Sequence, residues 1–215
     1  MLLMSIPSQK ILEIMVMIVQ GSLDLVAIRQ GDCKQLVGAN LAGTDLQGAQ
    51  LAGADLSQAN LMGANLAGAN LQNAQLRANL RGADLTNTNL TGADLRNADL
   101  RGTILIDAQV QSASLAGAFC MGAIWSNLDL TGVDLRGADL RGINLCQAIL
   151  CQADLSYANL SGADLSQADL EEANLSGAVF RGTNLTQANL LCAIVDQVQW
   201  FGTILDGACL KGTPL

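Results

Sequence analysis

The most informative absence from this sequence of 215 residues is histidine, of which it contains none. Histidine is the commonest general base and metal ligand of proteins, so a site of either kind lacks its usual residue here. Aromatic residues are also scarce, at 3% of the chain, although 50% of the residues are hydrophobic. A globular core of that size normally recruits Phe, Tyr and Trp for their large buried areas. The composition therefore favours a narrow core of small and medium side chains, and it indicates neither an enzyme nor a protein that holds a metal ion or another cofactor.

The cysteines lack the spacings of zinc sites and of secreted disulfide frameworks. There are six of them, scattered along the chain, and none form a C-x-x-C pair. They are Cys33, Cys120, Cys146, Cys151, Cys192 and Cys209. This scatter predicts reduced thiols that serve as small packing residues in a reducing compartment. We therefore expect a cytoplasmic protein.

Long hydrophobic runs are missing as well. The apolar run Ile11–Val19 is interrupted by Glu13 and is far shorter than the ~20 residues that span a bilayer. Neither a basic n-region nor a small-residue cleavage site, the marks of a secretory signal, is evident before Gly21. We expect no membrane insertion and a soluble, intracellular chain.

What the sequence does contain is a repeat of five residues. Residues 54–58 (ADLSQ) and 158–162 (ANLSG) follow one formula: Ala, then Asp or Asn, then Leu, then two variable residues. The Leu-type position recurs every five residues up to Leu76 and again from Leu80 onward, with a single spacing of four between these two. Five residues advance ~500° on a helix and reach opposite sides of a straight strand, so neither element gathers these leucines on one face. A chain that turns a corner every five residues does gather them.

The sequence from Gln35 to Leu215 resembles the pentapeptide-repeat family, and its Leu-centred, Gly-rich form looks most like the cyanobacterial branch. The resemblance implies an all-β fold, a right-handed quadrilateral parallel β-helix (a β-solenoid) with the Leu and the preceding Ala inside. We expect this β-helix over residues 35–215, with irregularities near residues 77–78 and 103–127. In the second of these, Trp125 at a Leu-type position is offset by the small Cys120, which would conserve core volume.

Residues 1–34 precede the repeat and are expected to form a helical cap over the open edge of the first coil. Apolar residues recur at helical spacing between Ile11 and Ile18, although that segment is also β-prone. A second short helix is predicted to begin after Ser22 and to end before Gly31.

The most distinctive surface feature is a row of arginines directly after the Leu-type position. If four repeats make one coil, residues twenty apart stack on one face. The arginines with that spacing are Arg81, Arg101, Arg141 and Arg181, and Arg96 and Arg136 lie one corner away. One interpretation is a basic stripe that binds an acidic partner. The more ordinary one is a solvated ladder, because Asp99 and Asp139 should lie beside two of the arginines, and exposed ion pairs stabilise by only about 0–1 kcal/mol. The row remains the best candidate for a contact surface.

These features predict a non-catalytic scaffold or regulatory protein that presents the faces of a rod to an unknown protein partner. The resemblance offers an alternative, since some members of the family mimic duplex DNA and bind DNA gyrase. About nine coils would make a rod of roughly 43 Å, and duplex DNA of that length carries about 25 negative charges. The net charge here is −8 and arginines interrupt the acidic rows. We therefore rank the DNA mimic second, and we expect no direct binding of nucleic acid.

The repeat runs to Leu215 without a capping segment after it. An open sheet edge invites pairing with another chain, and the family that the sequence resembles often forms dimers through the C-terminal ends. Trp200 is inward by register and Phe201 outward, so we expect an apolar surface near this end and an end-to-end homodimer through the final coils. The alternative is that residues 205–215 fold back over the last coil and leave a monomer.

Overall fold

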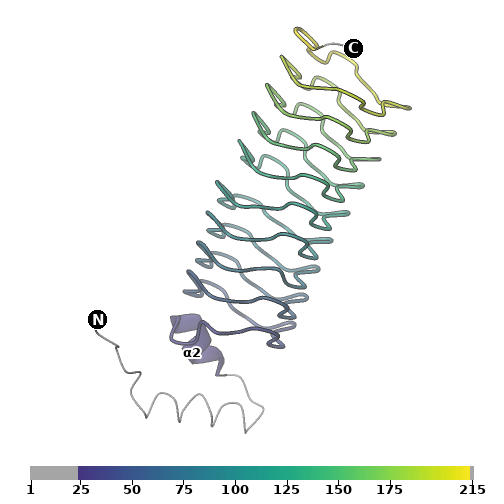
Figure 1. The fold of residues 1–215 in the computed structure, drawn as a ribbon. Helices are drawn as coiled ribbons and strands as arrows, with labels where there is room; N and C mark the ends of the chain where they lie inside the picture. Colours follow the sequence, from purple (N-terminus) through teal and green to yellow (C-terminus); the bar gives the residue numbers. More distant parts are fainter. Residues whose placement is uncertain (1–23, 214–215) are drawn as a thin grey trace.

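The structure, a computed structural model, describes residues 24–213, and they form a stack of coils that rises as a rod (Figure 1). Each coil pairs in parallel with the next through single-residue bridges rather than through long strands. The first coil makes its bridges from Gln35, Asn40, Asp45 and Gln50, each to the residue 20 positions later. The rod therefore has four sides, and residues that stack on one side are one coil apart in the sequence.

The corners between the sides are tight turns closed by a backbone hydrogen bond. In a typical corner the Ala59 N–H donates to the Leu56 carbonyl oxygen at 3.0 Å. The second variable residue of each corner lies in the left-handed region, with a φ of 60° at Gln58 and 65° at Gly63. This conformation is free of steric cost only for glycine, which explains why glycine is so frequent at the second variable position.

The core of the rod consists of the two inward positions of the repeat. Leu160 and Ala158, which represent these positions, are both 0% exposed. The large residues Trp125 and Phe180 are buried in the same core, as is the small Cys120 beside Trp125. The predicted orientation of the repeat, with Leu and Ala inside, is thus the one that the structure has.

The helix α2 (Leu25–Gln30) covers the N-terminal end of the first coil. Asp24 caps its start through side-chain bonds to backbone N–H groups, and Gly31, with a φ of 80°, ends it. The Arg29 carbonyl oxygen accepts a bond of 2.9 Å from the N–H of Gln50, a donor of the first coil. The second predicted helix is confirmed, whereas the first lies outside the described residues. Within residues 24–213, α2 is the single helix, and it is too short to cross a membrane.

The repeat with four residues alters one corner. Here the Ala78 N–H donates to the Leu76 carbonyl oxygen at 2.7 Å, one residue closer than in the other corners. The missing position is the outermost one, which Gln58 fills in the coil before and Asn97 in the coil after. The bridge spacing falls to 19 residues in this coil, from Asn60 to Asn79, and then returns to 20.

A second irregularity lies where the chain departs from the formula around Trp125. No bridge joins Gln109 to Asp129 in the described chain, and the Val110 N–H finds no backbone acceptor there. Leu128 occupies the inward position that the formula gives to Ala, so this repeat holds two oversized side chains, both buried. Excess volume in a packed core displaces the backbone. We attribute the local separation of the coils to this pair.

An oversized residue at the Ala position is insufficient by itself. Ile143 occupies that position between Leu140 and Leu145, and all backbone bonds of its repeat are present. The turn closed by Leu128 is also longer than usual, with 3.3 Å from its N to the Trp125 carbonyl oxygen. The small Cys120 therefore fails to offset the tryptophan completely.

Candidate functional site

The residues directly after the Leu-type position stack into columns, and one column carries most of the predicted arginines. Backbone bonds join its members from coil to coil: the Gly82 N–H donates to the Arg101 carbonyl oxygen and the Gly162 N–H to that of Arg181, both at 2.9 Å. The column consists of Ala42, Met62, Arg81, Arg101, Met121, Arg141, Ser161, Arg181 and Phe201.

A column of bridge residues runs beside it on the same side of the rod. These residues are Asn40, Asn60, Asn79, Asp99, Phe119, Asp139, Asn159, Val179 and Gln199. We call the side formed by the two columns the arginine face. It contains four arginines and two aspartates, a local excess of positive charge on a chain whose net charge is −8.

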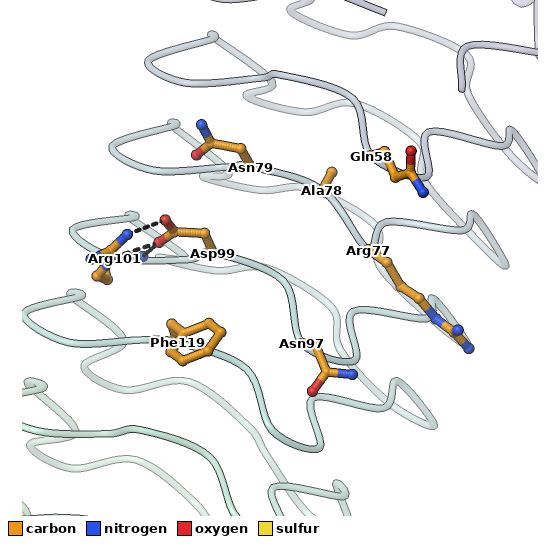
Figure 2. A pocket seen from close by; sticks show the side chains of 8 residues that line it. All are labelled: Gln58, Arg77, Ala78, Asn79, Asn97, Asp99, Arg101 and Phe119. Atoms are coloured by element: carbon orange, nitrogen blue, oxygen red, sulfur yellow. Dashed lines mark hydrogen bonds and ion pairs between the residues drawn. The ribbon is translucent and has the colours of Figure 1, made fainter. Parts of the chain in front are cut away.

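The residue two positions earlier decides which of these arginines is paired. In the segment Asp139-Leu140-Arg141 the guanidinium binds both carboxylate oxygens, with Nε 2.7 Å from Oδ1 and Nη2 2.6 Å from Oδ2. Arg101 binds Asp99 in the same bidentate manner (Figure 2). These hydrogen bonds lower the pKa of both aspartates below the ordinary value and raise the pKa of the arginines. The two pairs therefore remain ionised at neutral pH, and each arginine is tied to its own aspartate.

The other two arginines of the face lack a carboxylate partner among residues 24–213. Arg81 follows Asn79, whose Oδ1 accepts only its backbone N–H, at 3.2 Å. Arg181 follows Val179, and its guanidinium lies over the ring of Phe201 at 5.7 Å from the centroid. The sequence predicts the pairs of Arg101 and Arg141 from Asp99 and Asp139, and the Asn and the Val at the same position explain why Arg81 and Arg181 lack such a pair.

Exposed apolar side chains are interspersed among the arginines along this face. Phe119 and Met121 lie between the two arginine–aspartate pairs and are 48% and 43% exposed. Met62 is exposed on one side of this group and Phe201 on the other. A surface that combines arginine, methionine and aromatic side chains has the composition of the core of protein interfaces.

A hollow of about 430 Å³ adjoins the arginine face at the corner that lacks its outermost residue (Figure 2). Arg77, Ala78 and Asn79 of the short corner line it, with Gln58 and Asn97 of the adjacent coils at its two ends. Its wall is formed by Phe119 and by the ion pair of Asp99 and Arg101. We call it the corner notch. The spacing of four predicts an irregularity here, but not a hollow, because the wall comes from a residue two coils further along.

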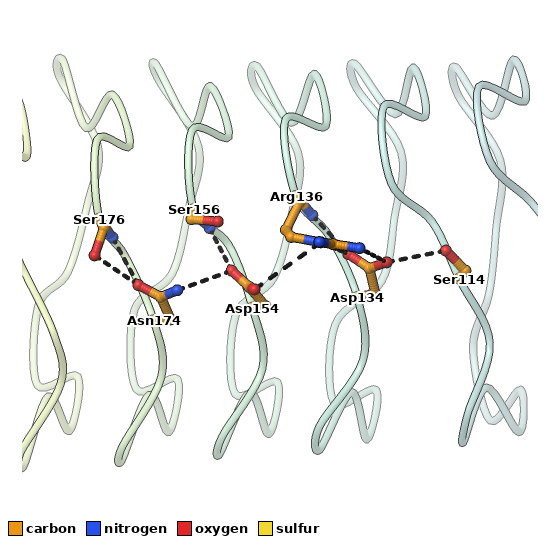
Figure 3. A network of polar contacts seen from close by, with 7 residues as sticks. All are labelled: Ser114, Asp134, Arg136, Asp154, Ser156, Asn174 and Ser176. Atoms are coloured by element: carbon orange, nitrogen blue, oxygen red, sulfur yellow. Dashed lines mark hydrogen bonds and ion pairs between the residues drawn. The ribbon is translucent and has the colours of Figure 1, made fainter.

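Arg96 and Arg136 lie on the neighbouring side of the rod, away from the arginine face. Arg136 donates to Asp134 through Nε at 2.8 Å and lies 4.0 Å from Asp154 in the next coil. Figure 3 shows that this pair belongs to a continuous ladder of polar side chains along the coils. The ladder runs through Ser114, Asp134, Arg136, Asp154, Ser156, Asn174 and Ser176. Arg136 thus has the geometry of the solvated ladder.

The thiols and acids form no centre of their own in the described chain. All six cysteines are unpaired, and no three potential ligands lie close enough to hold a metal ion within residues 24–213. Burial, together with the carboxylate of Asp169, raises the pKa of Cys151 to about 11, and burial raises that of Cys120 well above its ordinary value. Neither thiol has the lowered pKa that makes a cysteine a nucleophile.

The chain matches the family model of pentapeptide repeats, with 8 copies over segments that together run from residue 44 to residue 198. Among solved structures it is similar to the pentapeptide-repeat protein Rfr23 from the cyanobacterium Cyanothece 51142. The identity is 35% over 45% of this chain and 58% of that one, with a TM-score of 0.35. It is 32% identical to HetL from the cyanobacterium Nostoc sp. strain PCC 7120, a protein involved in the regulation of heterocyst differentiation, over 93% of this chain and 94% of HetL, with a TM-score of 0.32.

A third solved structure, QnrB1, a plasmid-mediated fluoroquinolone resistance protein, is 19% identical over 83% of this chain and 91% of that one, with a TM-score of 0.42. No curated protein matches the chain. The repeat formula, the coils and the match over most of the chain agree on one assignment. The chain belongs to the pentapeptide-repeat family, and its coils form the right-handed β-helix of that family.

Proposed function

We propose that this rod is a non-catalytic scaffold or regulatory protein that binds another protein through the arginine face. The observation that carries the proposal is that arginines and exposed apolar side chains are interspersed along one column of the rod. Interfaces combine an apolar centre with charged groups, and arginine and aromatic side chains contribute most of their affinity. The thiols favour a reducing compartment such as the cytoplasm as the place of this interaction.

The face is suited to a partner with acidic groups. Its four arginines outnumber its two aspartates, and Arg81 and Arg181 are the two without a carboxylate of their own. An acidic group of the partner displaces only water from these two guanidiniums, whereas at Arg101 or Arg141 it must compete with a bidentate aspartate. The hydrogen-bonded coils hold the backbone beneath these side chains in place, so little backbone entropy is lost on binding.

The alternative, a mimic of duplex DNA that binds gyrase, requires a dense and uninterrupted negative surface. The described rod instead has an arginine face, and on the neighbouring side Arg136 lies between Asp134 and Asp154. We therefore expect no inhibition of gyrase supercoiling at low micromolar protein. Stoichiometric inhibition that weakens as salt rises would favour the mimic over the scaffold.

Site-specific photo-crosslinking tests the proposed face. A photo-crosslinking amino acid in place of Met121, at the centre of the arginine face, should link the rod to one defined protein in cells. The same amino acid in place of Gln72, which is exposed on the opposite side, is the matched control and should give no such product. The double variant Arg81→Glu with Arg181→Glu should abolish the Met121 product. Crosslinked products from position 72 but not from position 121 would contradict the proposal. So would a product from position 121 that is equally abundant in the double variant.

A further inference from the structure

The corner notch is a recess that the short repeat leaves in the surface of the described rod. In the other corners a residue with positive φ projects outward, as Gln58 and Asn97 do on either side. In the short corner that residue is missing, and the Ala78 N–H bonds directly to the Leu76 carbonyl oxygen. Because the adjacent coils keep their corners, the short corner becomes a hollow with two polar ends (Figure 2).

Positive charge is concentrated around this hollow. Between residues 75 and 101, the two sides that meet at the notch carry four arginines and two aspartates, a net charge of +2. The arginines are Arg77, Arg81, Arg96 and Arg101, half of the eight arginines in the chain. The remainder of the chain is correspondingly more acidic than the total of −8. An anionic group is therefore attracted to this end of the arginine face.

Arg77 is the side chain best able to bind such a group. Its Nε and Nη2 donate to Oδ2 of Asp94 at 2.9 and 2.7 Å. The same carboxylate also holds Arg96 through both oxygens, at 2.8 and 2.7 Å. If Arg77 turns into the notch, Asp94 therefore keeps a bidentate partner, so no unpaired charge is left behind. Arg101 lacks this freedom, because it is the sole bidentate partner of Asp99.

The walls indicate what accompanies the anion. Phe119 is half-exposed and offers an apolar surface, and the amides of Gln58 and Asn97 can bond to the backbone of an extended chain. A small inorganic anion makes no use of the phenyl ring. We propose that the corner notch binds an acidic peptide segment of a partner protein, with an Asp or Glu carboxylate on Arg77 and a neighbouring apolar side chain on Phe119. This inference rests on the proposed function, since it places the first contact of that partner at one end of the arginine face.

Filling the notch is the direct test. Insertion of one glycine between Arg77 and Ala78 restores the spacing of five, and with it the corner that the rest of the rod has. A displayed library of random peptides, selected on the full-length protein and counter-selected on the insertion variant, supplies the probe. We expect the enriched peptides to pair Asp or Glu with an apolar residue. A synthetic copy should bind the insertion variant and Arg77→Gln at least about tenfold more weakly, a loss of about 1.4 kcal/mol.

The control is Arg136→Gln, which removes an arginine of the same neighbouring side that stands far from the notch and is held by Asp134. It should leave peptide binding unchanged. Enriched peptides without acidic residues, failure to enrich any peptide, or equal binding to wild type and Arg77→Gln would overturn the inference. So would binding of a duplex oligonucleotide or of inorganic phosphate that depends on Arg77 as strongly as peptide binding does. Since Arg77→Gln is a surface change, the test survives misfolding of the insertion variant.

The two proposals fail separately. If crosslinking from position 121 persists in the insertion variant and in Arg77→Gln, the notch has no role while the arginine face keeps its partner. If crosslinking from position 121 is absent from the wild type, the proposed function itself is wrong, whatever the notch binds.

Discussion

The coils from Leu145 to Leu190 and those from Arg77 to Arg141 use the same formula with different strictness. In the first region every bridge and every corner bond is present. The second region contains the short corner, the separated coils near Trp125 and most of the arginines. The regular coils show that the repeat formula alone is sufficient for a stable stack. Departures from such a formula are expected at functional sites, where selection acts on something other than stability.

The regular region should tolerate outward changes and no inward ones. Leu160→Asp places an unpaired carboxylate among side chains that are 0% exposed, which costs several kcal/mol, so the rod should unfold locally or as a whole. Ser161→Asp, at the next and outward position, should change the melting temperature little. Circular dichroism during heating provides the comparison. Equal melting temperatures for the two variants would contradict the inward and outward assignment.

The irregular region should respond differently to a change of core volume. Leu150→Ala in the regular coils should cost about 2–5 kcal/mol, as large-to-small changes in a packed core do. Leu128→Ala restores the formula beside Trp125, so it should cost less than about 1 kcal/mol and allow the coils to close. Chemical denaturation gives the two costs, and hydrogen exchange should show added protection at the Val110 N–H. Equal costs, without added protection, would mean that the tryptophan and leucine are not what separates the coils.

Much of this fold was accessible from the sequence because each repeat satisfies its own geometry. A period of five allows only a chain that turns corners, and the end of α2 follows from Gly31. The separation of the coils at Gln109 depends on Leu128 and Trp125 together. Leu128 can be recognised in the sequence, because it stands where the formula has Ala. The expected offset of Trp125 by Cys120 does not account for Leu128.

The candidate site was less predictable for two physical reasons. Whether an arginine of the arginine face is paired depends on the residue two positions earlier, which the formula allows to be Asp or Asn with equal ease. The notch depends on Phe119, which the short corner meets only because coils stack at a fixed spacing. The pairing of the arginines can be read from the sequence, whereas the hollow beside Phe119 can be predicted only when the register of the whole stack is known.

The last described coil differs from the regular coils in its unpaired edge. The Trp200 and Leu205 N–H groups, which point along the rod axis by register, have no backbone acceptor within residues 24–213. Trp200 is half-buried and stacks on Phe180 at 5.1 Å between centroids, while Phe201 is 78% exposed. We predict an end-to-end homodimer through this coil, of twice the mass and nearly twice the length.

Sedimentation and small-angle scattering measure both quantities. Phe201→Glu should weaken the dimer at least about tenfold, because the contact would bury a charge. Tyr157→Glu, at an exposed corner of the regular coils, is the matched control and should leave association unchanged. A monomer at high micromolar concentration would favour the alternative, in which residues 205–215 cover the coil.

The smallest expected effect concerns acid. The bidentate arginines lower the folded-state pKa of Asp99 and Asp139 below that of the unfolded chain, which is about 3.9. A lowered folded pKa contributes stability that is present above the unfolded value and is lost as the pH falls through the folded one. This stability is therefore lost below about pH 4, and solvent screening limits the loss to a few degrees of melting temperature.

The double variant Arg101→Gln with Arg141→Gln removes both partners, so it should flatten the decline of melting temperature between pH 4 and pH 2. Arg181→Gln removes an arginine of the same face whose guanidinium lies over Phe201, and it should leave that decline as steep as in the wild type. A decline that both changes flatten alike would show that net charge, and not the pairing along the arginine face, governs the response to acid.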